Sequence, residues 1–87
     1  LDRKNLKKAE KMSRKSLEAE PDNASFLDTY GYILYLRKDY ENAKVYLKKA
    51  IVHGGNNNKD VLYHYALVLE ALGEKELADF YMNKSQK

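Results

Sequence analysis

An internal repeat of 34 to 35 residues limits the folds that this 87-residue chain can adopt. Ala9, Ala43 and Ala78 are separated by 34 and then 35 positions, and Leu17 and Ile51 are also 34 apart. Each period has room for two helices of ordinary length. One such hairpin is too small to bury its own apolar face, so the next hairpin must stack on it to complete the core. We therefore predict a solenoid of stacked helical hairpins.

Turn signals divide the chain into segments of helical length. Proline, glycine, asparagine and aspartate gather near positions 21–23, 38–39, 54–58 and 73–74, and these residue types interrupt regular structure. Between them apolar residues recur at helical spacing, not in alternation. The pattern predicts an all-α fold with no strand. Its five antiparallel helices are expected at about 2–18, 24–37, 40–53, 59–72 and 75–86.

Cap residues stand at the predicted helix boundaries. Asp22 or Asn23, Asp39 and Asn58 are placed as N-caps, where a side-chain oxygen accepts an N–H of the first turn. Gly54 is placed after a helix for a left-handed C-cap, in which a side chain would be strained. The one-residue difference between the two repeat periods falls in the 54–58 loop, where an insertion does not rotate a helix face.

Small residues recur where two helices of one hairpin should meet. Gly31 and Ala66 occupy equivalent positions in successive repeats, as do Ala43 and Ala78. Small side chains let helix axes approach closely, and larger residues fill the space on either side. We therefore expect Gly31 and Ala66 at close helix contacts.

Together these positions resemble the tetratricopeptide repeat. The best unit, 24–57, combines Leu27, Tyr30-Gly31, Leu34, Tyr40 and Ala43 with Leu47 and Ala50, and 58–87 repeats the pattern with Leu62, Tyr65-Ala66, Leu69, Gly73, Ala78 and Met82. Gly55 stands where the family usually has proline, and Ser85 replaces a usual alanine. The resemblance implies one α-α superhelical domain over 1–87. Residues 1–23 would be the second helix of a truncated repeat, followed by a full repeat at 24–57 and a terminal one at 58–87.

The resemblance also implies a function, because the first helix of each unit lines a concave groove that binds partner proteins. By alignment, this groove includes two sets of side chains from residues 24–37 and 59–72. The predicted partner-binding residues are Asp28, Thr29, Tyr32, Tyr35, Asp60, Tyr63 and His64. Tyrosine gives rigid contact area with a hydrogen-bonding tip, which suits a protein interface. The alternative is that these rings only pack between hairpins.

The same positions argue against one ligand class. Family members that hold the carboxylate of chaperone tails place Lys, Asn and Arg in the groove. Here the corresponding places are acidic and aromatic, including Asp28, Asp60 and Tyr63. The expected function is a protein-interaction scaffold, with a protein or peptide partner that is not an anionic tail.

Catalytic signals are weak. His53 precedes a Gly-Gly loop at a helix end, where the helix dipole favours an imidazolium. His64 follows Asp60 by one turn, a spacing at which the two could pair, but two ligands do not make a closed metal site. Ser13, Ser16, Ser25 and Ser85 lack a base at a diagnostic spacing, and no phosphate-binding loop is present. We expect no enzyme activity, no cofactor and no metal.

The distribution of charge along the chain indicates an alternative function. Residues 1–20 hold seven basic and four acidic residues, which accounts for the whole formal net charge of +3. A basic first helix with Lys4, Lys7, Lys8, Lys11, Arg14 and Lys15 could contact nucleic acid or an anionic membrane. No aromatic residue interleaves these positions, so a solvated face is the preferred interpretation.

Other features of the sequence give weaker information about the cellular compartment. Leu1 is not a start methionine, so we expect a piece of a longer protein, and no apolar run is long enough to span a membrane. With no cysteine, disulfides and thiolate sites are excluded. The strings 27–32 and 61–66 resemble the closing repeats of bacterial, often Bacteroidetes-type, tetratricopeptide proteins. Many of these are exported or lipid-anchored, so the resemblance implies a bacterial scaffold in the envelope or the cytoplasm.

Both ends of the predicted solenoid should carry uncovered apolar residues. The first helix lacks its hairpin partner, so its apolar side should be partly uncovered on one face; this side consists of Leu6, Ala9, Met12 and Leu17. Phe80 and Met82 lie on a final helix with no polar capping helix after it. We therefore expect weak homo-oligomerisation.

Overall fold

The computed structural model describes residues 3–87, with side chains from residue 5 onward, and contains five α-helices. They are α1 (Arg3–Ala19), α2 (Ala24–Leu36), α3 (Tyr40–Val52), α4 (Lys59–Ala71) and α5 (Lys75–Ser85), with a short 3-10 turn, η1 (Gly55–Asn57), after α3. The predicted helices are confirmed to within one residue at each end, apart from the predicted start at position 2, which lies outside the described residues. Residues 3–87 contain no strand.

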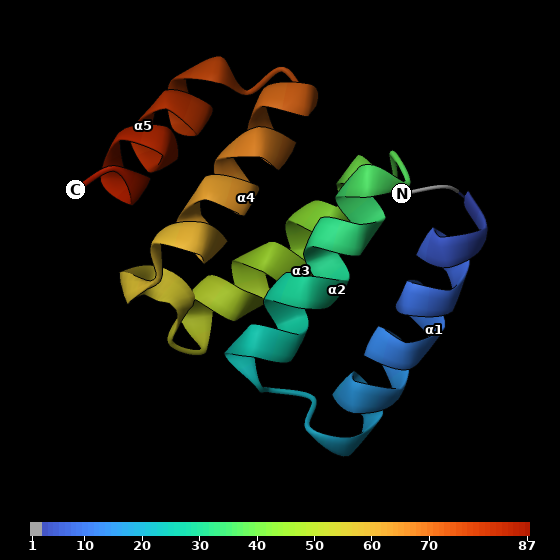
Figure 1. The fold of residues 1–87 in the computed structure, drawn as a ribbon. Helices are drawn as coiled ribbons and strands as arrows, with labels where there is room; N and C mark the ends of the chain where they lie inside the picture. The colour runs from blue at the N-terminus through green and yellow to red at the C-terminus, as the bar shows by residue number, and fades with distance from the viewer. Residues whose placement is uncertain (1–2) are drawn as a thin grey trace.

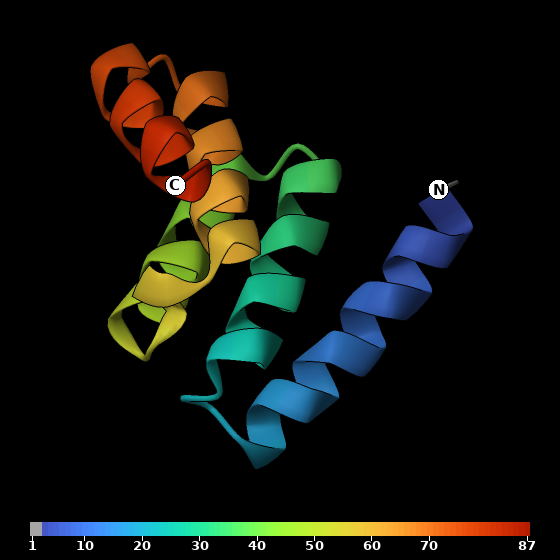
Figure 2. The ribbon, with the colours of Figure 1, turned by 60° about the vertical axis from the view of Figure 1, so that its left-hand side comes forward.

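The helices pack in chain order, as expected for an all-α repeat superhelix. In Figures 1 and 2, α1 flanks α2 and α5 lies at the opposite end of the molecule. The pairs α2–α3 and α4–α5 make the most extensive contacts, and α1 packs on α2 as α3 packs on α4. The all-α fold class is therefore confirmed.

Two of the predicted N-caps form, and one does not. Asn23 accepts the N–H of Phe26 at 3.1 Å, and Asn58 accepts the N–H of Asp60 at 2.9 Å. Asp39 is the N-cap residue of α3, but its side chain makes no cap hydrogen bond. Instead it accepts the side-chain amide of Asn42 at 2.9 Å. The predicted position of this N-cap is confirmed. The predicted hydrogen bond from the first turn to the Asp39 side chain is wrong, because the nearby Asn42 amide competes for the carboxylate.

The two hairpin turns share one backbone arrangement. The N–H of Asp39 donates to the carbonyl of Leu34, and the N–H of Glu74 donates to the carbonyl of Leu69, each at 2.9 Å. The residue before each of these N–H groups has a positive φ, 67° at Lys38 and 83° at Gly73. Such a left-handed residue commonly ends a helix and is usually glycine. Lys38 therefore occupies a strained conformation that Gly73 adopts freely.

Replacing Lys38 by glycine should stabilise the protein by about 0.5–1 kcal/mol. The left-handed backbone costs a non-glycine residue roughly 1–2 kcal/mol, part of which is offset because glycine loses more entropy on folding. Urea unfolding followed by circular dichroism measures the change. Lys48→Gly, at an exposed site inside α3, is the control and should destabilise by about 1 kcal/mol. An unchanged or lowered midpoint for Lys38→Gly would show that the turn carries no strain.

The core lies along the seams between successive helices. Its central side chains are completely or almost completely buried and come from α2, α3 and α4. They include Leu27, Leu47, Val61, Val68 and Leu69. The predicted close approach at Gly31 is confirmed, because a Cβ atom there would lie 2.7 Å from Cγ of Leu47. Ala66, the equivalent residue in the next hairpin, is also fully buried.

Polar contacts join the hairpins at their edges. Arg37 Nη1 lies 2.6 Å from Glu10 Oε2, which links the end of α2 to α1. Lys44 Nζ lies 2.7 Å from Glu74 Oε2, which links α3 to the turn before α5. Both pairs are partly exposed, so their contribution to stability is modest. They favour one relative placement of neighbouring helices.

The predicted apolar face of α1 is only partly uncovered. Leu6 and Leu17 are buried, and Ala9 is half-buried, in keeping with the expected partly uncovered face. Packing of α1 on α2 is sufficient to cover them. Met12 is 66% exposed, and Phe80 at the other end is 57% exposed. The two apolar ends are therefore small, as expected.

We still expect weak self-association, detectable only near millimolar protein. Two small apolar ends bury little area on pairing, and the basic residues of α1 repel one another at low ionic strength. Added salt should therefore strengthen the association. Sedimentation equilibrium over a concentration series tests this, with Met12→Ser and Phe80→Ser as variants that should weaken it. A strict monomer at millimolar protein in high salt would contradict the prediction.

Candidate functional site

Four of the predicted groove residues lie along α2. Asp28, Tyr32 and Tyr35 follow i, i+4, i+7 spacing, which puts them on one side of the helix. All three are half-buried, whereas Thr29 is exposed and its hydroxyl donates to the carbonyl of Ser25 at 3.0 Å. Helix α2 therefore presents one carboxylate and two aromatic rings along a continuous line.

The other predicted residues lie on α4, and the structure joins them to α2 through His64. His64 Nδ1 lies 2.9 Å from Asp28 Oδ1. The imidazole therefore pairs with Asp28 and not with Asp60, the partner that local spacing allowed. Asp60 is exposed in the first turn of α4, where its N–H donates to the Asn58 side chain. The side-chain contact across two repeats replaces the local one because α2 and α4 pack directly against each other.

Aromatic rings form a continuous row across the two helices. The ring of Tyr32 stacks on His64, with centroids 4.1 Å apart, and stacks on Tyr35 at 5.9 Å. Tyr63 lies at a 50° tilt to His64, with centroids 6.1 Å apart. We name these four residues, Tyr32, Tyr35, Tyr63 and His64, the aromatic row. Tyr63 is 44% exposed and the other rings are half-buried, so the row is both packed and accessible.

Tyr40 extends the row toward α3. Its ring lies 5.6 Å from that of Tyr35, at a tilt of 53°. Tyr40 is one of the repeat-pattern positions, and its half-buried state agrees with a packing role. It supports one side of Tyr35 and so helps to hold that ring in place.

The environment of Tyr35 shows which groups face it. Burial is the largest cause that raises the pKa of its hydroxyl, followed by Tyr40, Tyr32, the Glu70 carboxylate and Tyr63. Glu70 lies seven positions after Tyr63, on the same side of α4. Asp28 is therefore hydrogen-bonded to the row through His64, and the charge of Glu70 acts on the Tyr35 hydroxyl.

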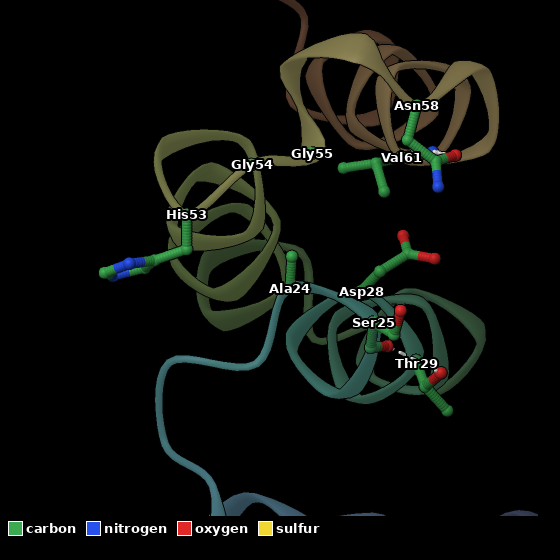
Figure 3. A pocket seen from close by; sticks show the side chains of 9 residues that line it. All are labelled: Ala24, Ser25, Asp28, Thr29, His53, Gly54, Gly55, Asn58 and Val61. Carbon is green, nitrogen blue, oxygen red and sulfur yellow. Dashed lines mark hydrogen bonds between the residues drawn. The ribbon is translucent and has the colours of Figure 1, made fainter.

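A polar pocket of about 310 Å³ adjoins the Asp28 end of the row. It lies between the first turns of α2 and α4 and is closed by the loop after α3 (Figure 3). The Asp28 carboxylate points toward Asn58 and Val61, whereas the His53 side chain points away from them. The lining residues are Ala24, Ser25, Asp28, Thr29, His53, Gly54, Gly55, Asn58 and Val61.

His53, Ser16 and Ser85 make contacts away from the aromatic row. His53 ends α3, as expected, and its Nε2 lies 3.5 Å from Asp22 Oδ1 on the surface. The hydroxyls of Ser16 and Ser85 donate to the backbone carbonyls of Met12 and Met82. Within residues 3–87, no group of three or more His, Asp or Glu side chains is close enough to hold a metal ion.

The basic surface of α1 is separate from the aromatic row. Lys7, Lys8, Lys11 and Lys15 are exposed, and the Arg14 guanidinium donates to the hydroxyl of Tyr30 at 3.3 Å. The Lys4 side chain lies outside the described part of the chain. The basic residues therefore form a solvated surface, of which Arg14 also supports the α1–α2 contact. No helix among the described residues has the length and apolar character that crossing a membrane requires.

Gly55 is a structural residue of the pocket that sequence reasoning did not identify. A Cβ atom there would lie 2.6 Å from the carbonyl oxygen of Ala50 and 2.9 Å from Cγ1 of Val61. Its equivalence to a usual proline position gave no sign of this contact. Gly54, predicted from its left-handed conformation, has the expected positive φ of 114° and open space around it.

Comparison with known proteins finds similar sequences over most of the chain. The family model for anaphase-promoting complex, cyclosome, subunit 3 matches residues 2–83. The chain is also 36% identical over 70 residues to a protein of Chlamydomonas reinhardtii, the chloroplastic PsbD mRNA maturation factor Nac2. That alignment covers 80% of this chain but 5% of the relative's own length. A bacterial origin stays a prediction, since this relative is a chloroplast protein.

Proposed function

Because the chain belongs to the anaphase-promoting complex, cyclosome, subunit 3 family of tetratricopeptide-like repeat proteins, we propose that it is a protein-interaction module holding a partner segment between α2 and α4. The family supports a role in protein–protein interaction. We assign the contact with the partner segment to the predicted residues Asp28, Thr29, Tyr32, Tyr35, Asp60, Tyr63 and His64. We also propose that the module has no catalytic activity.

One observation carries the proposal most directly, the aromatic row that crosses two repeats. Tyr32 stacks on His64, and the Asp28–His64 hydrogen bond of 2.9 Å fixes the imidazole that the ring rests on. A surface of rings held in place before binding loses little side-chain entropy when a partner arrives. Exposed tyrosines in such a setting are common sources of interface affinity.

The pocket beside Asp28 suits the same role. Its carboxylate, hydroxyl and amide groups could accept a polar side chain of the partner, while the aromatic row contacts the apolar parts. Interfaces that combine aromatic anchors with a polar surround are typical of protein recognition. We therefore place one end of the bound segment at this pocket.

The basic surface of α1 is the alternative contact, for nucleic acid or an anionic membrane. It offers exposed lysines but no ring for base stacking, and Arg14 is bonded to the hydroxyl of Tyr30. Ionic strength separates the two sites. Affinity for phosphate groups falls steeply with salt, whereas an aromatic contact should change modestly.

Selection from a random nine-residue peptide library tests the proposed function. Peptides bound by the wild-type protein should bind the Tyr32/Tyr35/Tyr63→Ala variant at least tenfold more weakly, about 1.4 kcal/mol. The control replaces three exposed apolar residues outside the row, Val45, Val52 and Phe80, and should bind normally. Equal binding by the tyrosine variant, or an empty selection, would contradict the proposal.

A further inference from the structure

A second cavity, of about 290 Å³, lies between α1, α2 and α3. Its polar lining groups come from three helices: Arg14 and Glu18 from α1, Tyr30 from α2, and Tyr46 and Lys49 from α3. Two of these side chains are cations and one is a carboxylate. The cavity therefore has a net positive charge.

This cavity lies on a different side of α2 from the aromatic row. Tyr30, which lines it, stands two positions after Asp28 and two positions before Tyr32. Residues two positions apart on a helix do not face the same side, and no residue of the aromatic row lines the cavity. A ligand bound here is therefore independent of a partner segment held between α2 and α4.

Two tyrosine rings hold the cations at the cavity. The rings of Tyr30 and Tyr46 meet edge to face, with centroids 4.7 Å apart. Arg14 Cζ lies 6.0 Å from the centroid of Tyr30, and Lys49 Nζ lies 5.4 Å from the centroid of Tyr46. Because a ring face attracts a cation, these contacts keep both charges beside the cavity.

Hydrogen-bond donors of this cavity remain available to a ligand. Arg14 Nη2 donates to the Tyr30 hydroxyl at 3.3 Å, which leaves the other N–H groups of the guanidinium. The hydroxyl accepts that bond, so its own proton can be donated elsewhere. Neither Arg14 nor Lys49 forms an ion pair with another residue among 5–87. The cavity therefore offers donors and positive charge to an acceptor that the described chain does not supply.

The next repeat contains the same pair of rings in a different polar setting. Tyr65 and Tyr81, each 35 positions later, also meet edge to face, with centroids 4.9 Å apart. There Lys84, the equivalent of Lys49, donates to the side chain of Asn56 at 2.8 Å. The ring pair is thus a packing feature of both repeats. The available lysine distinguishes the first repeat.

We infer that this cavity binds the phosphate group of a phosphate monoester that has a small apolar body. A guanidinium matches the geometry of phosphate oxygens, and lysine is a common phosphate ligand as a point charge. A phosphate monoester is strongly anionic at neutral pH, and its terminal oxygens accept hydrogen bonds. The apolar body would lie against Leu17 and Leu27, which also line the cavity and are buried.

Titration with phenyl phosphate, followed by ¹H–¹⁵N NMR, tests the inference on the whole chain. Binding should saturate with a dissociation constant of about 1 mM, and the amide signals of Leu17 and Lys49 should move more than that of Tyr63. Inorganic phosphate lacks the apolar body and should bind at least about threefold more weakly. Phenol lacks the charge and should bind at least about tenfold more weakly.

Charge variants assign the binding to the cavity. Lys49→Gln should weaken phenyl phosphate at least about threefold, whereas the matched control Lys48→Gln, at an exposed position of α3 outside the cavity, should leave it unchanged. Glu18→Gln removes the carboxylate from the cavity and should strengthen binding about twofold or more. Its control, Glu76→Gln on α5, is exposed and should have no effect.

A phosphotyrosine peptide identifies the source of the phosphate group. Tighter binding of the peptide than of phenyl phosphate would assign the cavity to a phosphorylated protein. Equal or weaker binding would assign it to a small phosphate ester. Both results support the site, provided that they keep the dependence on Lys49.

Three results would overturn the inference. Inorganic phosphate that binds as tightly as phenyl phosphate would indicate an adventitious ion only. Equal effects of Lys48→Gln and Lys49→Gln would indicate attraction to the net charge of the protein, and titration without saturation up to about 20 mM would indicate no site. The Tyr32/Tyr35/Tyr63→Ala variant should bind phenyl phosphate normally, so failure of this inference leaves the proposed function intact, and the reverse also holds.

Discussion

Gly31→Leu should lower the free energy of unfolding by about 3 kcal/mol, at the upper end of the range for an overpacked core. A Cβ atom alone would lie 2.7 Å from Cγ and 3.3 Å from the backbone nitrogen of Leu47. Leu47 is completely buried, so it has no free space to move into. The larger side chain must separate α2 from α3 or displace the core. For a chain of this size the melting temperature should fall by roughly 12–24 °C.

Thermal unfolding by circular dichroism measures the loss, and Lys48→Leu is the control at an exposed position of α3. A second variant tests the cause. Leu47→Ala alone should cost about 2–5 kcal/mol, as a cavity in a packed core does. Combined with Gly31→Leu, it should cost less than the sum of the two changes, because the new side chain can occupy the vacated space. Strict additivity, or an unchanged melting temperature for Gly31→Leu, would mean that the two residues are not in contact.

The position of the helices could be predicted because several local signals agreed. Apolar spacing, turn residues and the cap asparagines Asn23 and Asn58 each marked the same boundaries. The repeat then gave the pairing of helices, and with it the close contact at Gly31. These properties depend on residues near one another in the chain, which is why the sequence was enough to predict them.

The partner of His64 could not be predicted in the same way. Asp60 is four positions away on the same helix, so local spacing favoured that pair. The bond to Asp28 depends on how far α4 is rotated relative to α2, and no local pattern encodes that angle. For the same reason the row of stacked rings appears only once the helices are packed.

The backbone conformation of Lys38 and the requirement for glycine at position 55 could not be predicted either, because the folded structure imposes both against the local sequence preference. Nothing in the sequence marks Lys38 as left-handed, because lysine rarely adopts that conformation. The turn geometry imposes it, as the equivalent Gly73 shows. At Gly55 the requirement for glycine comes from two other residues, Ala50 and Val61, that approach only in the folded chain.

Gly55→Ala should lower the free energy of unfolding by about 2–3 kcal/mol. The added methyl would lie 2.6 Å from the Ala50 carbonyl oxygen and 2.9 Å from Cγ1 of Val61. Ala50 and Val61 are both buried, one on α3 and one on α4. The carbonyl belongs to the backbone of a helix, so it cannot turn aside as a side chain could. The clash must move α4 relative to α3, and the melting temperature should fall by roughly 8–24 °C.

Two further variants identify the cause of the Gly55→Ala effect. Gly54→Asn changes the same loop, where nothing lies within 4 Å of an added Cβ, and asparagine tolerates a left-handed backbone. Its cost should stay below about 1 kcal/mol. Adding Val61→Ala to Gly55→Ala should not restore stability, because the contact with the Ala50 carbonyl remains and a core methyl pair is lost. If the melting temperature of Gly55→Ala instead equals that of the wild type, the α3–α4 junction is able to shift freely. The pocket beside Asp28, which Gly55 helps to close, would then not be rigid enough to position a partner.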